Sequence, residues 1–380
     1  MRFLEFTGEW KRSVLEKESI INPKTPPLQD EFIYIDLESV IKGKLINKKV
    51  VSKSEAPSRA QRVLSKQDIL FQCVRPYQLN NYVHKETDNE QWVASTGYAQ
   101  IRTMSNDTNF LYQLLNTPKF NQDVLLRCTG SSYPAISSSD LGKISISVCS
   151  LEEQRKIGYF LSLLDERIIT QNKIIEKLES LIRGIYSAAK QENWEMQFLK
   201  EILEERDEQN FCNYPVYSVA VREGVINQIE HLGRSFAAKD TRNYNVVHYG
   251  DIVYTKSPTG SFPYGIVKQS FVSHPVAVSP LYGVYKPRNP HIANILHHFF
   301  LSPINANNYL HSLIQKGAKN TINITSKRFL DKAILLPTDD DKIKKISFLI
   351  TAVGKKIHLE KDILRKLEVR KIDLLQRMFI

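Results

Sequence analysis

The chain has 380 residues, of which 42% are hydrophobic and 24% are charged, and its formal net charge is +11. This composition is typical of a globular protein of two or three domains and argues against a disordered chain. No apolar run reaches the roughly 18 residues that a membrane-spanning helix needs, and the early acidic residues in MRFLEFTGEW argue against a signal peptide. We therefore expect a cytoplasmic protein whose basic charge favours a polyanionic partner.

The first 149 residues predict an α/β unit. Short β-rich runs such as FIYID and DILFQCV alternate with helical stretches such as NFLYQLLN. Chemistry-bearing motifs are sparse here and in the rest of the chain. There is no phosphate-binding glycine loop, no dinucleotide fingerprint and no Asn-Pro-Pro-aromatic tetrapeptide of an amino-methyltransferase. The four cysteines form no CxxC motif and are predicted to be free thiols.

Residues 151–190 predict one long helix without an internal proline. Its apolar positions recur in alternating steps of four and three, which is the seam of a coiled coil. At 1.5 Å per residue the helix spans roughly 55–60 Å, so the seam needs a partner helix. The predicted seam residues are Ile157, Leu161, Leu164, Ile168, Gln171, Ile175, Leu178, Ile182 and Ile185.

The following segment repeats the first one, with landmarks displaced by roughly 180–190 residues. Trp10 recurs as Trp194 with the same spacing to a leucine, and Asp68 of QDILF recurs as Asp251 of GDIVY. An internal repeat of this length indicates a duplicated structural unit. Turn chemistry before a buried strand explains an acid at both Asp positions, so we favour a structural role for them over a catalytic one.

The long helix recurs as well, so the partner of the first seam lies in the same chain. The second seam consists of Ile346, Ile350, Val353, Ile357, Glu360, Leu364, Leu367 and Leu374, with Lys371 at one further position. A globular segment connects the end of the first helix to the start of the second, which favours an antiparallel pair. Gln171 and Glu360 occupy equivalent polar positions. They either set the register of the seam or lie slightly off it.

The predicted fold class is therefore α/β (α+β), with two tandem units related by a pseudo-twofold axis and two long helices that form an antiparallel intramolecular coiled coil. The predicted segments are globular domains at 1–149 and 193–337 and long-helix segments at 150–192 and 338–380. The adjacent histidines His297 and His298 lie in an apolar helical run, and we interpret them as packing residues because no matching Cys or acid cluster suggests a metal site.

Basic loops with Ser, Asn and Tyr fall at matching places in both repeats, and such loops suit contacts to phosphates and base edges. They include KKVVSKSEAPSRAQR and its counterpart HLGRSFAAKDTRNYN, VRPYQLNNY and its counterpart TKSPTGSFPY, and the pair TGSSY and QKGAKNT. Solvated surface loops are the alternative, which the repetition weakens. The predicted DNA-binding residues are Lys48, Lys49, Lys53, Arg59, Arg62, Arg75, Tyr77, Tyr82, Ser131, Ser132, Tyr133, Arg234, Lys239, Arg242, Lys256, Tyr264, Lys316, Lys319 and Asn320.

The chain resembles the specificity subunit of type I restriction-modification enzymes. The resemblance rests on LEEQRKIGYFLSLLDERI, with Glu153, Gln154, Lys156 and Asp165, and it is supported by RFLEFTGEW, ASTGY and GSSYPAIS. The family's usual proline before the first long helix is absent, and Lys342 and Ile343 stand in the second helix where the first has Glu153 and Gln154.

The resemblance implies a prokaryotic restriction system in which this chain is a non-catalytic, DNA-binding specificity subunit. Each target recognition domain would read one half of an asymmetric bipartite site in double-stranded DNA, and the coiled coil would set the gap. Two methyltransferase subunits would carry out DNA modification at adenine N6 with S-adenosylmethionine, and a restriction subunit would use ATP and Mg. No cofactor is expected in this chain. A coiled-coil adaptor without sequence-specific DNA binding is the alternative, and an unrecognised nuclease or methyltransferase is a second rival.

Overall fold

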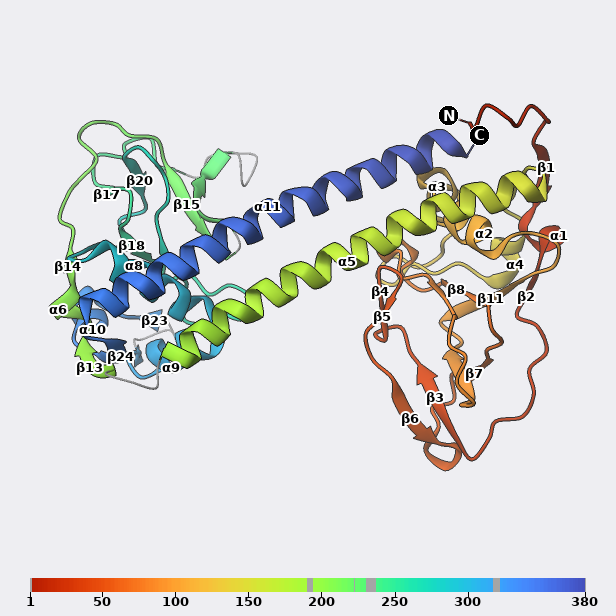
Figure 1. Ribbon diagram of the computed structural model, residues 1–380, viewed down its shortest axis with the longest axis horizontal. Coiled ribbons are helices and arrows are strands. Elements are labelled where there is room, and N and C mark those ends of the chain that lie inside the picture. Colours follow the sequence, from red (N-terminus) through yellow and green to blue (C-terminus); the bar gives the residue numbers. More distant parts are fainter. Residues whose placement is uncertain (1, 190–193, 222, 230–236, 317–321, 380) are drawn as a thin grey trace. The chain divides into compact units, whose positions relative to one another are not determined.

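The computed structural model describes residues 2–189, 194–221, 223–229, 237–316 and 322–379 (Figure 1). Its internal contacts divide the chain into two compact units. Unit 1 comprises Met1–Ile174 and Glu360–Ile380, and unit 2 comprises Ile175–Leu359. The long helices α5 (Leu151–Ala189) and α11 (Asp340–Met378) therefore contribute residues to both units.

Unit 1 is built on two four-stranded sheets and two small strand pairs. The first sheet, in which β3 and β10 run parallel, has the order β6 (Lys49–Ser52), β3 (Glu31–Ile35), β10 (Trp92–Ser95), β7 (Ala60–Val63). The second has the order β2 (Ser19–Ile21), β11 (Tyr98–Thr103), β8 (Ile69–Gln72), β9 (Tyr82–Val83). The pairs are β1 (Lys11–Val14) with β12 (Ser145–Val148), and β4 (Val40–Ile41) with β5 (Lys44–Leu45).

Helices cover the second sheet of unit 1 and begin at polar caps. The caps Asp107, Thr117 and Ser137 accept backbone N–H bonds at the starts of the three larger helices, which satisfies donors that the first turn leaves open. Those helices are α2 (Thr108–Leu115), α3 (Pro118–Leu126) and α4 (Ser138–Gly142), and the shorter ones are α1 (Leu15–Glu18) and the 3₁₀ turns η1 (Lys53–Glu55) and η2 (Pro76–Gln78).

Unit 2 repeats this topology. The order β14 (Leu203–Glu205), β21 (Gly283–Pro287), β18 (Ile252–Tyr254), β19 (Val267–Gln269) matches β2, β11, β8, β9. The pair β13 (Trp194–Phe198) with β24 (Ala333–Pro337) matches β1 with β12, and β17 (Asn245–Val247) with β20 (Val276–Val278) matches β7 with β10. The repeat inferred from sequence landmarks is thus also a repeat of strand pairing.

The remaining elements of unit 2 complete the parallel with unit 1. A parallel bridge joins Val216 to Ala277, as β3 joins β10. The strands are β15 (Tyr217–Ala220) with β16 (Gly224–Asn227), and β22 (Gln315–Lys316) with β23 (Ile322–Asn323). The helices are α6 (Leu199–Ile202), α8 (Pro290–Leu301), α9 (Pro303–His311) and α10 (Ser326–Leu330).

The two long helices pair antiparallel within each unit. In unit 1 the start of α5, at Ile157 and Leu161, shares one apolar core with Leu374 near the end of α11. In unit 2 the end of α5, at Ile185, packs with the core that contains Ile346 near the start of α11. All the predicted seam residues are buried or half-buried. The predicted fold class, with its antiparallel intramolecular coiled coil, is confirmed.

The polar seam positions face each other. The Gln171 side chain donates hydrogen bonds to the carboxylate of Glu360 and, at 3.1 Å, to its carbonyl oxygen, and the two residues are only 7% and 6% exposed. Nearby, Lys371 pairs with Asp165 at 2.5 Å. A buried polar pair at one position penalises any shift of the helices along the seam, so these residues fix the register.

None of the described helices combines the length and the apolar content that crossing a membrane requires. The predicted helical segments 150–192 and 338–380 contain α5 and α11, respectively. All four cysteines are free thiols, and two of them, Cys73 and Cys149, are buried.

Candidate DNA interface

Two loops of unit 1 that lie far apart in the sequence meet beside the end of β8. An isolated bridge joins Val74 to Ala135, and the backbone N–H of Arg75 donates to the carbonyl of Pro134 at 2.8 Å. The Arg75 guanidinium then lies over the Tyr133 ring, 4.3 Å from its centroid. Predicted DNA-binding residues from VRPYQLNNY and GSSY thus form one surface feature.

A buried amide network holds the first of these loops. The Gln72 side chain donates to the carbonyl of Val74 at 2.7 Å and to the side chain of Gln78 at 2.8 Å, and it accepts from the backbone of Asn80. The backbone of Gln72 in turn donates to Asn81 at 2.8 Å. Because buried amides with satisfied partners are costly to break, the network fixes the loop's shape.

The cationic side chains of the segment 48–62 differ in their surroundings: some lie beside a carboxylate, and others do not. Lys49 bonds to Asp36, and this hydrogen bond raises the pKa of the lysine. Lys48 lies 3.4 Å from Glu86 and over the ring of Trp92. Lys53 and Arg59 are exposed, and among the described residues neither pairs with a carboxylate. Arg62 is half-buried, and its loss of water contact lowers its pKa.

The remaining predicted contacts of unit 1 are exposed, with one correction. Tyr77 is 53% exposed, and Ser131 and Ser132 also face solvent. Tyr82 is only 7% exposed, because it lies on β9 within the core that contains Leu70. The prediction of Tyr82 as a DNA contact is therefore wrong for a surface role. Burial raises the pKa of its phenol to about 12.

Unit 2 places its predicted contacts less uniformly. Lys239 and Arg242 are both exposed, but Arg242 donates hydrogen bonds from two nitrogens to the carboxylate of Asp240. Lys256 and Tyr264 are half-buried, and the Tyr264 ring contacts that of His311. The predicted contacts Arg234, Lys319 and Asn320 lie outside the described residues, and Lys316 is described only as part of β22.

A buried ion pair supports each of these loop regions, and turn chemistry alone did not predict it. Asp68 is fully buried, accepts from the backbone of Ser65, and pairs with Arg102 at 2.8 Å. Asp251 accepts from the backbone of His248 and pairs with Arg206 at 2.7 Å. The turn role is therefore confirmed, but each carboxylate also neutralises an arginine, and the hydrogen bond from each to its Asp raises that arginine's pKa.

The two arginines come from different strands. Arg102 lies on β11, next to the residue of that strand that pairs with the start of β8. Arg206 instead follows β14, which pairs with β21 on the side away from β18. At the position of Arg206, unit 1 has Asn22, which bonds to the backbone of Gln100. Each unit thus neutralises its buried aspartate with an arginine from a different strand. The spacing of the residues in the sequence did not reveal this difference.

The motif at the start of α5 acts structurally. Glu153, 1% exposed, forms a bidentate pair with Arg2 at 2.6 and 2.7 Å. Gln154 bonds to the backbone of Asp107 at 2.9 Å, which anchors the loop before α2. A side-chain carbon added at Gly158 would lie 2.6 Å from Asp107, so only glycine permits this close approach.

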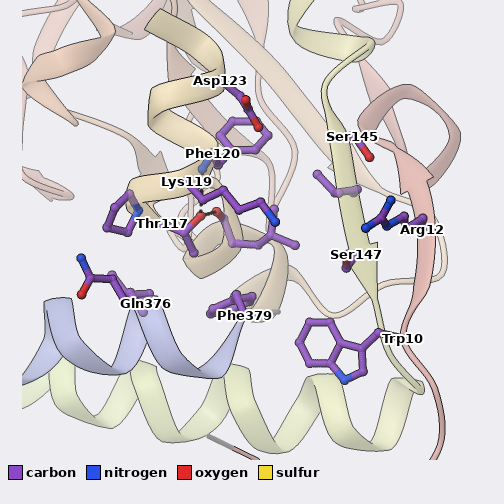
Figure 2. A pocket seen from close by; sticks show the side chains of 14 residues that line it. Trp10, Arg12, Thr117, Lys119, Phe120, Asp123, Ser145, Ser147, Gln376 and Phe379 are labelled. Atoms are coloured by element: carbon purple, nitrogen blue, oxygen red, sulfur yellow. Dashed lines mark hydrogen bonds between the residues drawn. The ribbon is translucent and has the colours of Figure 1, made fainter.

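One pocket of unit 1 has a volume of about 520 Å³ (Figure 2). Figure 2 shows Arg12 and Lys119 on facing walls, above the rings of Trp10 and Phe379. Its lining contains neither histidine nor cysteine and none of the predicted DNA-binding residues.

Unit 2 contains a cluster of cationisable groups, in which Lys268 is buried and His297 and His298 are half-buried. Lys268 is 2% exposed, and the N–H of Gln269 donates to the ring of His297 at 3.0 Å. Burial lowers the pKa of His298 to about 4, that of Lys268 to about 8, and that of His297 well below its ordinary value. Among the described residues no group of His, Cys, Asp and Glu could hold a metal ion.

Acid should destabilise unit 2 through this cluster. A histidine whose pKa is lowered by folding contributes stability above its unfolded value of about 6.5 and loses it as the pH falls toward 4. Between pH 7 and pH 4.5, we expect the free energy of unfolding of the wild-type protein to fall by on the order of 2–3 kcal/mol more than that of His298→Leu. Urea unfolding at both pH values measures this. The control is His274→Leu, which removes an exposed histidine; equal losses in all three proteins would contradict the assignment.

Comparison with known proteins agrees with this architecture. Residues 20–180 match the family model of the type I restriction modification DNA specificity domain. Over 160 residues the chain is 22% identical to the type I restriction enzyme HindI specificity subunit of Haemophilus influenzae, a match that covers 41% of this chain and 35% of the relative. The matched part thus spans about a third of the curated relative's length.

Solved structures extend the likeness to the whole chain. The type I specificity subunit of M. genitalium superimposes with a TM-score of 0.62 at 14% identity and covers all of this chain and 98% of that one. A chain from a structural study of type I restriction-modification complex assembly gives 0.51 at 18% identity, with 97% of both chains covered. At such identities these matches show the fold.

The fold is a duplicated α/β unit combined with two long helices that pair antiparallel within each unit. Residues 20–180 match the DNA specificity domain of type I restriction-modification systems, and the fold of the whole chain is similar to that of the M. genitalium specificity subunit.

Proposed function

We propose that the chain is the non-catalytic subunit that selects the DNA sequence in a type I restriction-modification complex. Each unit reads one half of a bipartite site, and because the loop sequences differ, the two halves differ. The observation that carries this proposal is the placement of equivalent loops. The segments 73–81 and 255–266 connect the same pair of strands in the two units, and both carry cationic and aromatic side chains.

The electrostatics support DNA as the ligand. The net charge is +11, and Lys53, Arg59 and Lys239 are exposed and unpaired among the described residues. Lys and Arg contacts to phosphates supply most of the sequence-independent affinity, and Arg, Asn and Tyr side chains on loops can then read base edges. The chemistry of methylation and cleavage belongs to partner subunits, which would use S-adenosylmethionine, and ATP with Mg, respectively.

The long helices supply the docking surface and the spacer in this proposal. α5 presents Tyr159, Phe160 and Leu163 to solvent, and α11 presents Phe348 and Leu349, all at least 40% exposed. Apolar side chains gathered on helices already paired through another face suit further helices from two methyltransferase subunits. Because each helix contributes to both units, its length is proposed to set the gap between the half-sites. This arrangement implies a cytoplasmic complex.

The alternative is a scaffold without sequence-specific DNA binding. Such a scaffold would show no salt-dependent affinity for duplex DNA, whereas a protein that neutralises several phosphates loses affinity steeply as salt rises. Binding measured at two salt concentrations therefore separates the two functions.

Exchange of one unit should alter one half of the methylated sequence. Residues 193–337 are replaced by the corresponding residues of a relative, and the chain is expressed with its methyltransferase partner. Genome-wide mapping of methylated adenines should show a new half-site joined to the original other half. A change in both halves, or in neither, would contradict modular recognition.

A further inference from the structure

We propose that Arg75 is the base-reading side chain of unit 1 and that it recognises a guanine. This inference rests on the proposed function and adds a residue and a base to it. Arg75 lies in the loop between β8 and β9.

The loop is held in a strained shape. Arg75 (φ 54°, ψ 54°) and Leu79 (φ 55°, ψ 36°) both adopt the left-handed conformation and bracket the 3₁₀ turn η2. Non-glycine residues in this region are strained and persist only where surrounding contacts enforce them. The contacts that do so here are the Gln72 network and the hydrogen bond from Arg75 to Pro134. Two such residues in one exposed loop point to a functional geometry.

The second loop is shaped to meet the first. The backbones of Thr129 and Ala135 exchange hydrogen bonds of 2.9 Å, which closes a tight turn over residues 130–134. Gly130 has a φ of 90°, and a side-chain carbon there would lie 3.1 Å from the carbonyl of Tyr133. The turn therefore requires glycine, and it presents Tyr133, 64% exposed, as a platform for Arg75.

The stacked guanidinium is oriented but not neutralised. Among the described residues no carboxylate pairs with Arg75, in contrast to Arg102, Arg206 and Arg242. Stacking on an aromatic ring restrains the plane of a guanidinium while its edge N–H groups remain open. A fixed planar fork of donors matches the O6 and N7 acceptors of guanine, which is the commonest specific contact to a base. A phosphate contact would not need this preorganisation.

The test compares variants at Arg75 by mapping methylated sites. Arg75→Gly suits the left-handed backbone and removes the side chain, so the loop is retained. We expect discrimination to fall by roughly 5- to 150-fold at one G·C position of the unit 1 half-site, while the unit 2 half-site is unchanged. Arg75→Lys keeps the charge without the fork and should also relax that position. Arg127→Ala, which removes an exposed arginine bonded to the carbonyl of Asp123, is the matched control.

The platform supplies a second readout. Tyr133→Phe keeps the ring and should keep the discrimination, whereas Tyr133→Ala should reduce it at the same position as Arg75→Gly. Methylation that falls uniformly at all sites in Arg75→Gly would make Arg75 a phosphate contact and overturn the inference, as would a profile like that of Arg127→Ala. If exchange of residues 193–337 succeeds while these variants fail, only the assignment of Arg75 is refuted; if the exchange fails, the proposed function falls.

Discussion

Replacing Asp68 by alanine should destabilise the second sheet of unit 1 by about 3 kcal/mol. The Asp68 carboxylate is fully buried and accepts from Ser65, Gln100 and two nitrogens of Arg102. Removing one partner of a buried pair leaves the others unsatisfied and costs about 3–5 kcal/mol. The Arg102 side chain is 36% exposed and can recover water contacts, which favours the lower end of this energy range. Hydrogen exchange of the β8 and β11 amides measures the loss.

Two further variants test whether the loss of stability is specific to the Asp68 ion pair. Asp140→Ala removes an exposed carboxylate of the same unit that bonds to Ser137, and it should change exchange in β8 by less than about 1 kcal/mol. Asp251→Ala should destabilise β18 and β21 of unit 2 and leave the exchange rates of β8 and β11 as in the wild type. If Asp68→Ala and Asp140→Ala give the same exchange rates in β8, the ion pair does not hold the sheet.

The long helices were predictable because their information is local. The steps of four and three express the 3.5-residue repeat of a coiled coil directly, and the equivalent positions of Gln171 and Glu360 follow from aligning the two repeats. The antiparallel direction followed from the domain-sized connection. The Gln171–Glu360 hydrogen bonds then decided between the two interpretations of these residues, in favour of a pair that fixes the register.

The loop surface was only partly predictable because its geometry depends on distant contacts. Composition singled out Arg75 and Tyr133 separately, but their stacking depends on a bridge between segments about 60 residues apart. Tyr82 was misassigned because it ends a basic, aromatic stretch, whereas both faces of β9 are buried: Tyr82 packs in the core with Leu70, and Val83 packs in another core cluster. The partners of Asp68 and Asp251 depend on strand register, which a single sequence does not display.

Shortening both long helices by one heptad should change the permitted gap between the half-sites. The seam partners of residues 172–178 are residues 353–359, because Gln171 lies opposite Glu360 in an antiparallel pair. Deleting both segments keeps the Gln171–Glu360 and Asp165–Lys371 pairs and moves the next seam pair, Ile182 with Ile350, into the place of Ile175 and Ile357. Seven residues correspond to about 10 Å of helix, or about three base pairs of duplex. Methylation of DNAs that differ only in gap length measures the change.

The physical reason for a large effect is the helical twist of DNA. Three base pairs also rotate the duplex by about a third of a turn, so a half-site at the original spacing would face a different direction. We therefore expect methylation at the original gap to be lost, and any surviving activity to occur at a new gap with both half-site sequences unchanged. Deleting only residues 172–178 is the control, because it places apolar side chains opposite Glu360 and should destabilise the helix pair instead. If the double deletion folds, binds its partner subunits and methylates only the original gap at the original rate, the helices do not measure the spacing.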